Sequence, residues 1–74
     1  MTKYQLYYNE KIIGTFDTED LAMDTFYEDK KQFKDLNGYV GAYKIDDVIT
    51  IDFGSHFNFY YIKEVMEWIN IKKR

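Results

Sequence analysis

The sequence feature that most constrains the fold is the alternating pattern of residues 39–53, YVGAYKIDDVITIDF. The pattern is centred on Asp46-Asp47, and a two-residue turn at that pair predicts a β-hairpin. In this register one face is uniformly apolar, with Val40, Ala42, Ile49, Ile51 and Phe53, and the other carries Tyr39, Tyr43, Ile45, Val48, Thr50 and Asp52. A slip of one residue would turn the apolar set toward solvent, so the pattern favours this register.

Residues 3–16, KYQLYYNEKIIGTF, predict a second hairpin, which turns at Asn9-Glu10. Aromatic and β-branched residues dominate both arms, and asparagine is a common turn residue. Two registers stay open: a two-residue loop pairs Leu6 with Ile13, whereas a three-residue loop pairs Tyr8 with Ile12 and Tyr4 with Phe16.

The stretch FDTEDLA, residues 16–22, is the best local helix signal in the chain. Asp17 is predicted to cap the helix with Asp20 in a near capping box, and Phe16 is predicted to pack on Leu21 as a hydrophobic staple. Asn37-Gly38 supplies the stop, with the glycine in the left-handed conformation. We therefore predict a helix over about 18–36, whose buried stripe is Leu21, Ala22, Phe26, Phe33 and Leu36.

Asp29 falls inside this apolar stripe. An unpaired carboxylate is costly in such a place. Three explanations stay open: the residue lies at the rim of the stripe, the helix bends there, or the carboxylate meets a partner.

From about Asn58 the apolar spacing changes to that of a helix, with a predicted stripe of Tyr61, Ile62, Val65, Trp68 and Ile69. Tyr60 and Ile71 fall on the far side of this predicted helix, so we expect them to be exposed. Residues 56–59, HFNF, fit either the start of the helix or a short additional strand.

These elements predict one small domain, residues 1–74, of the α+β class. The order is ββαββα: a two-layer sandwich of a four-stranded antiparallel sheet, with a fifth short strand at 56–59 as an option and two helices on one face. The chain has no cysteine and is 20% aromatic. Aromatic packing, rather than disulfides, is therefore expected to hold the core.

Three groups of residues match part of a reactive-site motif, and chance or a structural role explains each match better. Asp52-Phe53-Gly54 matches a kinase tripeptide without the other kinase motifs. Ser55, His56 and Asp52 supply the letters of a triad, but a polar turn explains them better in so short a chain. The pair Asp46-Asp47 is better explained as a turn than as metal ligands. We expect no enzyme activity, no cofactor and no metal.

Two surfaces are predicted to meet partners. The acidic residues Asp20, Asp24, Glu28 and Asp35 lie opposite the apolar stripe of the first helix, and such a row can imitate phosphates in a basic groove. An ordinary solvated helix face, with Lys31 pairing Asp35, explains the same row and is the simpler interpretation, because charged rows are the usual outer face of amphipathic helices. Tyr39 and Tyr43 share the open face of the sheet, which Tyr7, or Tyr4 and Tyr8, would extend. Tyr60 completes the predicted partner-binding set.

Phe, Tyr, Ile, Asn and Lys, which AT-rich codons encode, supply 35 of the 74 residues. This usage indicates an AT-rich genome, such as that of a low-GC Gram-positive bacterium or one of its phages. With a net charge of −3 and no apolar run long enough to span a membrane, we expect a cytoplasmic protein, acting in the host cytoplasm if it is phage-encoded. The function predicted is that of a small protein-binding inhibitor from a phage or mobile element. It would dock on a larger host or defence protein, such as a nucleoprotein, in an anti-CRISPR-like manner. The alternatives are a nucleic-acid-binding accessory protein that uses the tyrosine face, and a homodimer of structural role.

Overall fold

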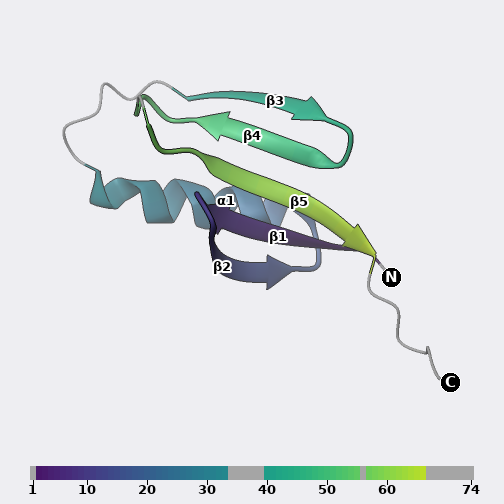
Figure 1. Ribbon diagram of the computed structural model, residues 1–74. Helices are drawn as coiled ribbons and strands as arrows, with labels where there is room; N and C mark the ends of the chain where they lie inside the picture. Colours follow the sequence, from purple (N-terminus) through teal and green to yellow (C-terminus); the bar gives the residue numbers. More distant parts are fainter. Residues whose placement is uncertain (1, 34–39, 56, 67–74) are drawn as a thin grey trace, which may run out of the picture.

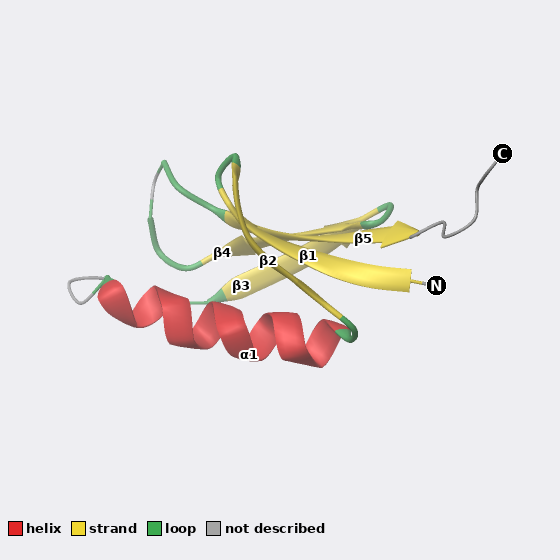
Figure 2. Ribbon diagram, turned by 90° about the horizontal axis from the view of Figure 1, so that it is seen from below, coloured by secondary structure: helices red, strands yellow, loops and turns green. Residues whose placement is uncertain are grey.

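The computed structural model describes residues 2–33, 40–55 and 57–66. Its elements follow the order ββαβββ: β1 (Thr2–Tyr8), β2 (Lys11–Phe16), α1 (Glu19–Asp29) with a short 3₁₀ helix η1 (Lys30–Gln32), β3 (Gly41–Ile45), β4 (Val48–Asp52) and β5 (Tyr60–Met66). The strands form one antiparallel sheet in the order β2-β1-β5-β4-β3 (Figure 1). α1 lies across one face of this sheet (Figure 2). The α+β class is therefore confirmed, with five strands and one helix in the described residues.

The predicted second helix is wrong over the residues that the structure describes, because β5 occupies residues 60–66. This strand lies in the centre of the sheet and pairs with both β1 and β4. Its alternation buries Tyr60 and Ile62, whereas the predicted helical stripe had placed Tyr61 beside Ile62. The strand option at 56–59 is also wrong for residues 57–59, which precede β5. Trp68, Ile69 and Ile71 lie outside the described residues.

The hairpin of β3 and β4 has the predicted register throughout, from Ile45 opposite Val48 to Gly41 opposite Asp52. Its turn begins at Asp46, which adopts a positive φ of 56°. The predicted apolar face is largely the inner one. Ile51 and Phe53 are buried, and Val40 and Ile49 pack against the core, whereas Ala42 is exposed.

The hairpin of β1 and β2 uses both of the predicted registers in turn. Next to the Asn9-Glu10 turn, Tyr8 pairs with Lys11 and Tyr7 with Ile12, as a two-residue loop requires. A bulge then shifts the pairing, so that Leu6 lies opposite Gly14 and Tyr4 lies opposite Phe16. One extra residue on β2, Ile13, accounts for the shift.

α1 begins one residue later than predicted, because its N-cap is Thr18 rather than Asp17. The Oγ1 atom of Thr18 accepts a hydrogen bond from the Leu21 backbone N–H at 3.2 Å. The predicted buried stripe is wrong at Leu21, which is 48% exposed. Ala22 and Phe26 are buried as predicted. Phe33 packs on the core from beyond the helical residues, and Leu36 lies outside the described part of the chain.

The core lies between α1 and the sheet and combines aromatic with aliphatic side chains. Its buried residues are Leu6, Ala22, Phe26, Ile51, Phe53, Tyr60 and Ile62. The ring of Tyr60 is central: it meets Phe26 edge-on at 4.9 Å between centroids and Phe53 edge-on at 5.1 Å. Edge-to-face aromatic pairs add stability beyond the area they bury, which suits a short chain without disulfides.

Candidate functional site

The face of the sheet opposite α1, which we call the open face, carries a row of side chains across all five strands. Ile12, Tyr7, Tyr61, Thr50 and Tyr43 are consecutive cross-strand partners, so their side chains point to the same side. A second row contains Gln5, Lys63, Val48 and Ile45. No described element covers these rows (Figure 2). The open face is therefore both aromatic and accessible in the described structure.

A shallow depression of about 300 Å³ lies on the open face. Tyr7, Tyr61, Lys63 and Val48 line it from the sheet, and Asn9 and Glu10 line it from the first turn. The Lys63 ammonium lies 5.4 Å from the centre of the Tyr7 ring, within cation–π range. The Tyr7 hydroxyl donates a hydrogen bond to Gln5 Oε1 at 3.1 Å. The depression thus combines aromatic surface with one cation and one carboxylate.

The acidic surface, defined here as Asp20, Asp24 and Glu28, lies on α1. All three residues are exposed, and their i,i+4 spacing puts successive carboxylates about 6 Å apart along the helix axis. Lys31 forms an ion pair with Glu28 at 3.0 Å. The predicted pair of Lys31 with Asp35 lies outside the described residues. The predicted acidic row is therefore accessible at its three described positions.

The predicted partner-binding residues do not form one site. The acidic surface is on the helix layer, whereas Tyr43, 58% exposed, is on the opposite side of the sheet. Tyr60 was predicted to be exposed, and this is wrong, because its side chain is 0% exposed in the core. Tyr39 lies outside the described residues. The aromatic part of the open face is completed instead by Tyr7 and Tyr61, and β-alternation in residues 60–66 would have been the signal that found Tyr61.

Asp29 meets a partner from within the chain, which was one of the three explanations left open. Its Oδ2 atom accepts hydrogen bonds from the Tyr60 hydroxyl at 2.5 Å and from Gln32 Nε2 at 3.1 Å. The pKa of Tyr60 is raised well above its ordinary value of 10.0. Burial is the largest cause, and the Asp29 carboxylate is the next. Because α1 ends at Asp29 and β5 begins at Tyr60, this contact ties the helix end to the central strand.

The residues that match parts of catalytic motifs, within 52–56, have structural roles where the structure describes them. Asp52 Oδ1 accepts a hydrogen bond from the Gly54 N–H at 2.9 Å. Ser55 Oγ accepts from the N–H groups of Phe57 and Asn58 at 3.3 and 3.1 Å. Both side chains therefore shape the segment after β4, and Phe53 lies in the core. His56 is outside the described residues. Within the part of the chain that the structure describes, no group of three metal-ligating residues comes together.

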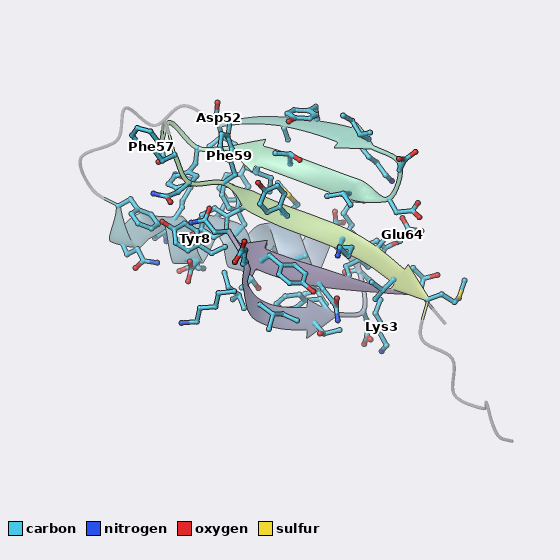
Figure 3. The ribbon with its side chains drawn as sticks, viewed as in Figure 1. Lys3, Tyr8, Asp52, Phe57, Phe59 and Glu64 are labelled. Carbon is cyan, nitrogen blue, oxygen red and sulfur yellow. The ribbon has the colours of Figure 1, made fainter. Side chains whose placement is uncertain are left out.

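Side chains at the two ends of the sheet differ in character. Tyr8, Phe57 and Phe59 lie at the end where β5 begins, and Lys3 and Glu64 lie toward the end where it finishes (Figure 3).

At the end where β5 begins, Asn9 contacts the loop before β5 through three hydrogen bonds. Its backbone N–H donates to the Phe59 carbonyl at 2.9 Å, its Oδ1 accepts from the Phe59 N–H at 3.0 Å, and its Nδ2 donates to Asn58 at 2.8 Å.

Comparison of the chain with protein-family models, with curated proteins and with solved structures gave no match. Among the described residues, no helix has the length and apolar character that crossing a membrane requires. Any proposal about function therefore depends on the two surfaces described above.

Proposed function

We propose that this chain is a small, non-enzymatic protein-binding domain of phage or mobile-element origin, which docks on and inhibits a larger host or defence protein. The acidic surface on α1 is the proposed contact, and it occludes a basic, nucleic-acid-binding groove in an anti-CRISPR-like manner. The observation that carries this proposal is the exposure of Asp20, Asp24 and Glu28 along one rigid helix. Of these three carboxylates only Glu28 forms an ion pair with a described residue.

Electrostatics supports a protein partner with a basic surface. Like charges held in a row raise the local potential, and a complementary basic groove gains from it in both association rate and specificity. The spacing along α1 is also comparable with that of successive phosphates in a nucleic-acid strand. The helix is held to the sheet by Ala22 and Phe26, which are both buried, so the row is presented with little loss of conformational freedom on binding.

The test is charge reversal with a matched control. The variant Asp20→Lys/Asp24→Lys/Glu28→Lys is expected to lose capture of its partner from a lysate of a low-GC Gram-positive bacterium, while circular dichroism shows the fold retained. The control reverses Glu10, Asp46 and Asp47, which are exposed carboxylates in the two hairpin turns, and therefore changes the net charge equally. Circular dichroism must show that the control is folded as well, because Asp46 has a positive φ. Equal capture by both variants would contradict the proposal, and added nucleic acid should displace the wild-type protein from a true partner.

The second candidate function is the binding of single-stranded nucleic acid on the open face. Tyr7, Tyr61 and Tyr43 are accessible from one side of the sheet, and sheet aromatics can stack bases. Lys63 beside Tyr7 supplies one cation for the backbone. A mobility shift with labelled single-stranded RNA or DNA, lost in Tyr7→Ala/Tyr43→Ala and weakened by salt, would favour this function over the first.

A further inference from the structure

The two edge strands of the sheet differ in how well they are protected. β2 carries the bulge, and the ring of Phe16 lies over Gly14 so closely that a Cβ atom there would be 2.9 Å from it. Bulges and covering side chains hinder the addition of another strand. β3 has no irregularity in its pairing with β4, and its residues Ala42 to Ile45 are all exposed.

The helix layer does not reach β3. α1 packs against β1, β2 and β5, so the two faces of β3 and its outer edge are accessible together. In the described part of the chain no strand pairs with this outer edge, which is visible at the top of the sheet in Figure 1. An exposed, regular edge strand with unpaired backbone groups is a template for another strand.

The turn at Asp46-Asp47 determines which backbone groups of β3 are free. In a hairpin closed by two residues, the flanking residues Ile45 and Val48 form a hydrogen-bonded pair. Because the pattern alternates, Tyr43 also directs its N–H and C=O groups toward β4. Ala42 and Lys44 direct theirs outward, away from the sheet.

We propose that β3 pairs antiparallel with β3 of a second copy of this chain, about a two-fold axis at Tyr43. In this register Ala42 lies opposite Lys44 of the second copy, and each such pair exchanges hydrogen bonds through outward backbone groups. Gly41 lies opposite Ile45 of the second copy, so that the smallest residue of the strand accommodates a large one. Tyr43 meets its own symmetry mate on the open face. The result is a continuous ten-stranded sheet.

Charge and size select this register. Pairing must keep each residue opposite one on the same face, so the neighbouring registers are shifted by two residues. A shift in one direction sets Lys44 directly opposite Lys44 of the second copy, and like charges in that position are destabilising. A shift in the other direction leaves Ile45, which is 62% exposed, without a partner strand. The register centred on Tyr43 pairs all five residues of β3 and opposes no like charges.

The contact is small, so a transient dimer is expected rather than an obligate one. Analytical ultracentrifugation across protein concentrations from about 10 µM to about 1 mM should show a rise toward the dimer mass. Tyr43→Asp, which sets two carboxylates opposite each other, should remain monomeric over this range. Thr15→Asp places the same charge on the exposed surface of the other edge strand and should dimerise like the wild type.

Disulfide trapping tests the register itself, because the chain has no cysteine of its own. In Tyr43→Cys the two Cα atoms across the axis would be about 4.5 Å apart, within the range that a disulfide spans. In Ile45→Cys, at an equally exposed position on the same face, they would be offset by four residues, or about 13 Å. Under mild oxidation the first variant should form dimers at least about tenfold faster than the second.

A wild-type protein that stays monomeric at the highest concentration would overturn the proposal, as would equal crosslinking at positions 43 and 45. Neither outcome bears on the acidic surface of α1. The self-pairing of β3 is therefore tested separately from the proposed function.

Discussion

The two hairpins of this protein are built alike but end in different environments. Each has a two-residue turn whose first residue, Asn9 or Asp46, adopts a positive φ of 54° or 56°. The hairpin of β1 and β2 contacts α1 and contains a bulge, whereas β3 is regular and lies beyond the helix. The difference shows that a hairpin's register can be settled locally, while its cover depends on where the rest of the chain packs.

The largest expected effect separates the helix-covered region from the exposed strand. Phe26→Ala removes a fully buried ring and should lower the free energy of unfolding by about 3–5 kcal/mol. Tyr43→Ala, at a position 58% exposed, should cost less than about 1 kcal/mol. Urea denaturation followed by circular dichroism measures both. Similar costs for the two variants would mean that β3 is as well packed as the helix layer.

The two turns provide the next comparison. Asn9→Ala and Asp46→Ala each force an alanine into the left-handed region, at a cost of about 1–2 kcal/mol. Asn9→Ala also removes two side-chain hydrogen bonds to the loop before β5, which should add about 1 kcal/mol or more. The difference between the two variants in thermal or urea unfolding therefore isolates the tie between the first turn and β5. Equal destabilisation would show that this tie contributes nothing.

The contact between the end of α1 and β5 should have a smaller effect. Tyr60→Phe keeps the buried ring but leaves the Asp29 carboxylate with one fewer donor, at a cost of about 1–2 kcal/mol at neutral pH. As a control, Tyr43→Phe removes an exposed hydroxyl and should be nearly neutral. Urea denaturation compares the two. If both variants match the wild type, the Tyr60–Asp29 hydrogen bond does not stabilise the fold.

The same contact predicts a dependence on alkaline pH. Tyr60 has a pKa of 10.0 in the unfolded chain and a higher pKa in the folded state. Between these two pKa values the unfolded state binds fewer protons than the folded state. The Tyr60 hydroxyl gives stability no pH dependence below about pH 10. Above that pH, stability falls as the pH rises, by up to about 1.4 kcal/mol per pH unit. Tyr60→Phe should reduce this slope in unfolding measurements at pH 9 to 11. An unchanged slope would contradict the raised pKa.

The smallest effect belongs to the ion pair between β3 and β5. Lys44 and Glu64 are 3.7 Å apart and both side chains are partly exposed, at 50% and 37%. An ion pair of this kind contributes less than about 1 kcal/mol, and salt screens it. Lys44→Gln should therefore change the unfolding midpoint only slightly. A large loss of stability would indicate that β3 depends on this contact with the central strand.

Local sequence was sufficient for the elements whose contacts are close in the chain. The turn at Asp46-Asp47 and the alternation around it determined the register of β3 and β4, because a shift would expose Ile51 and Phe53. Polar residues before an apolar stripe determined that α1 starts near Thr18. The acidic surface followed directly, since residues four apart share one side of a helix.

Only the tertiary structure decided the secondary structure of residues 60–66. The same residues fit a helix with an apolar stripe through Ile62 and Val65, or a strand that buries Tyr60 and Ile62. These residues form a strand because they lie between β1 and β4. Pairing with both strands satisfies the backbone hydrogen-bonding groups of β5, although the two partners are distant from each other in sequence. The same packing gave Asp29 its donor in Tyr60 and put Tyr61, rather than Tyr60, on the open face. Long-range pairing of this kind leaves no local signature, and it separated the predicted binding residues into a core tyrosine, a helix surface and a sheet face.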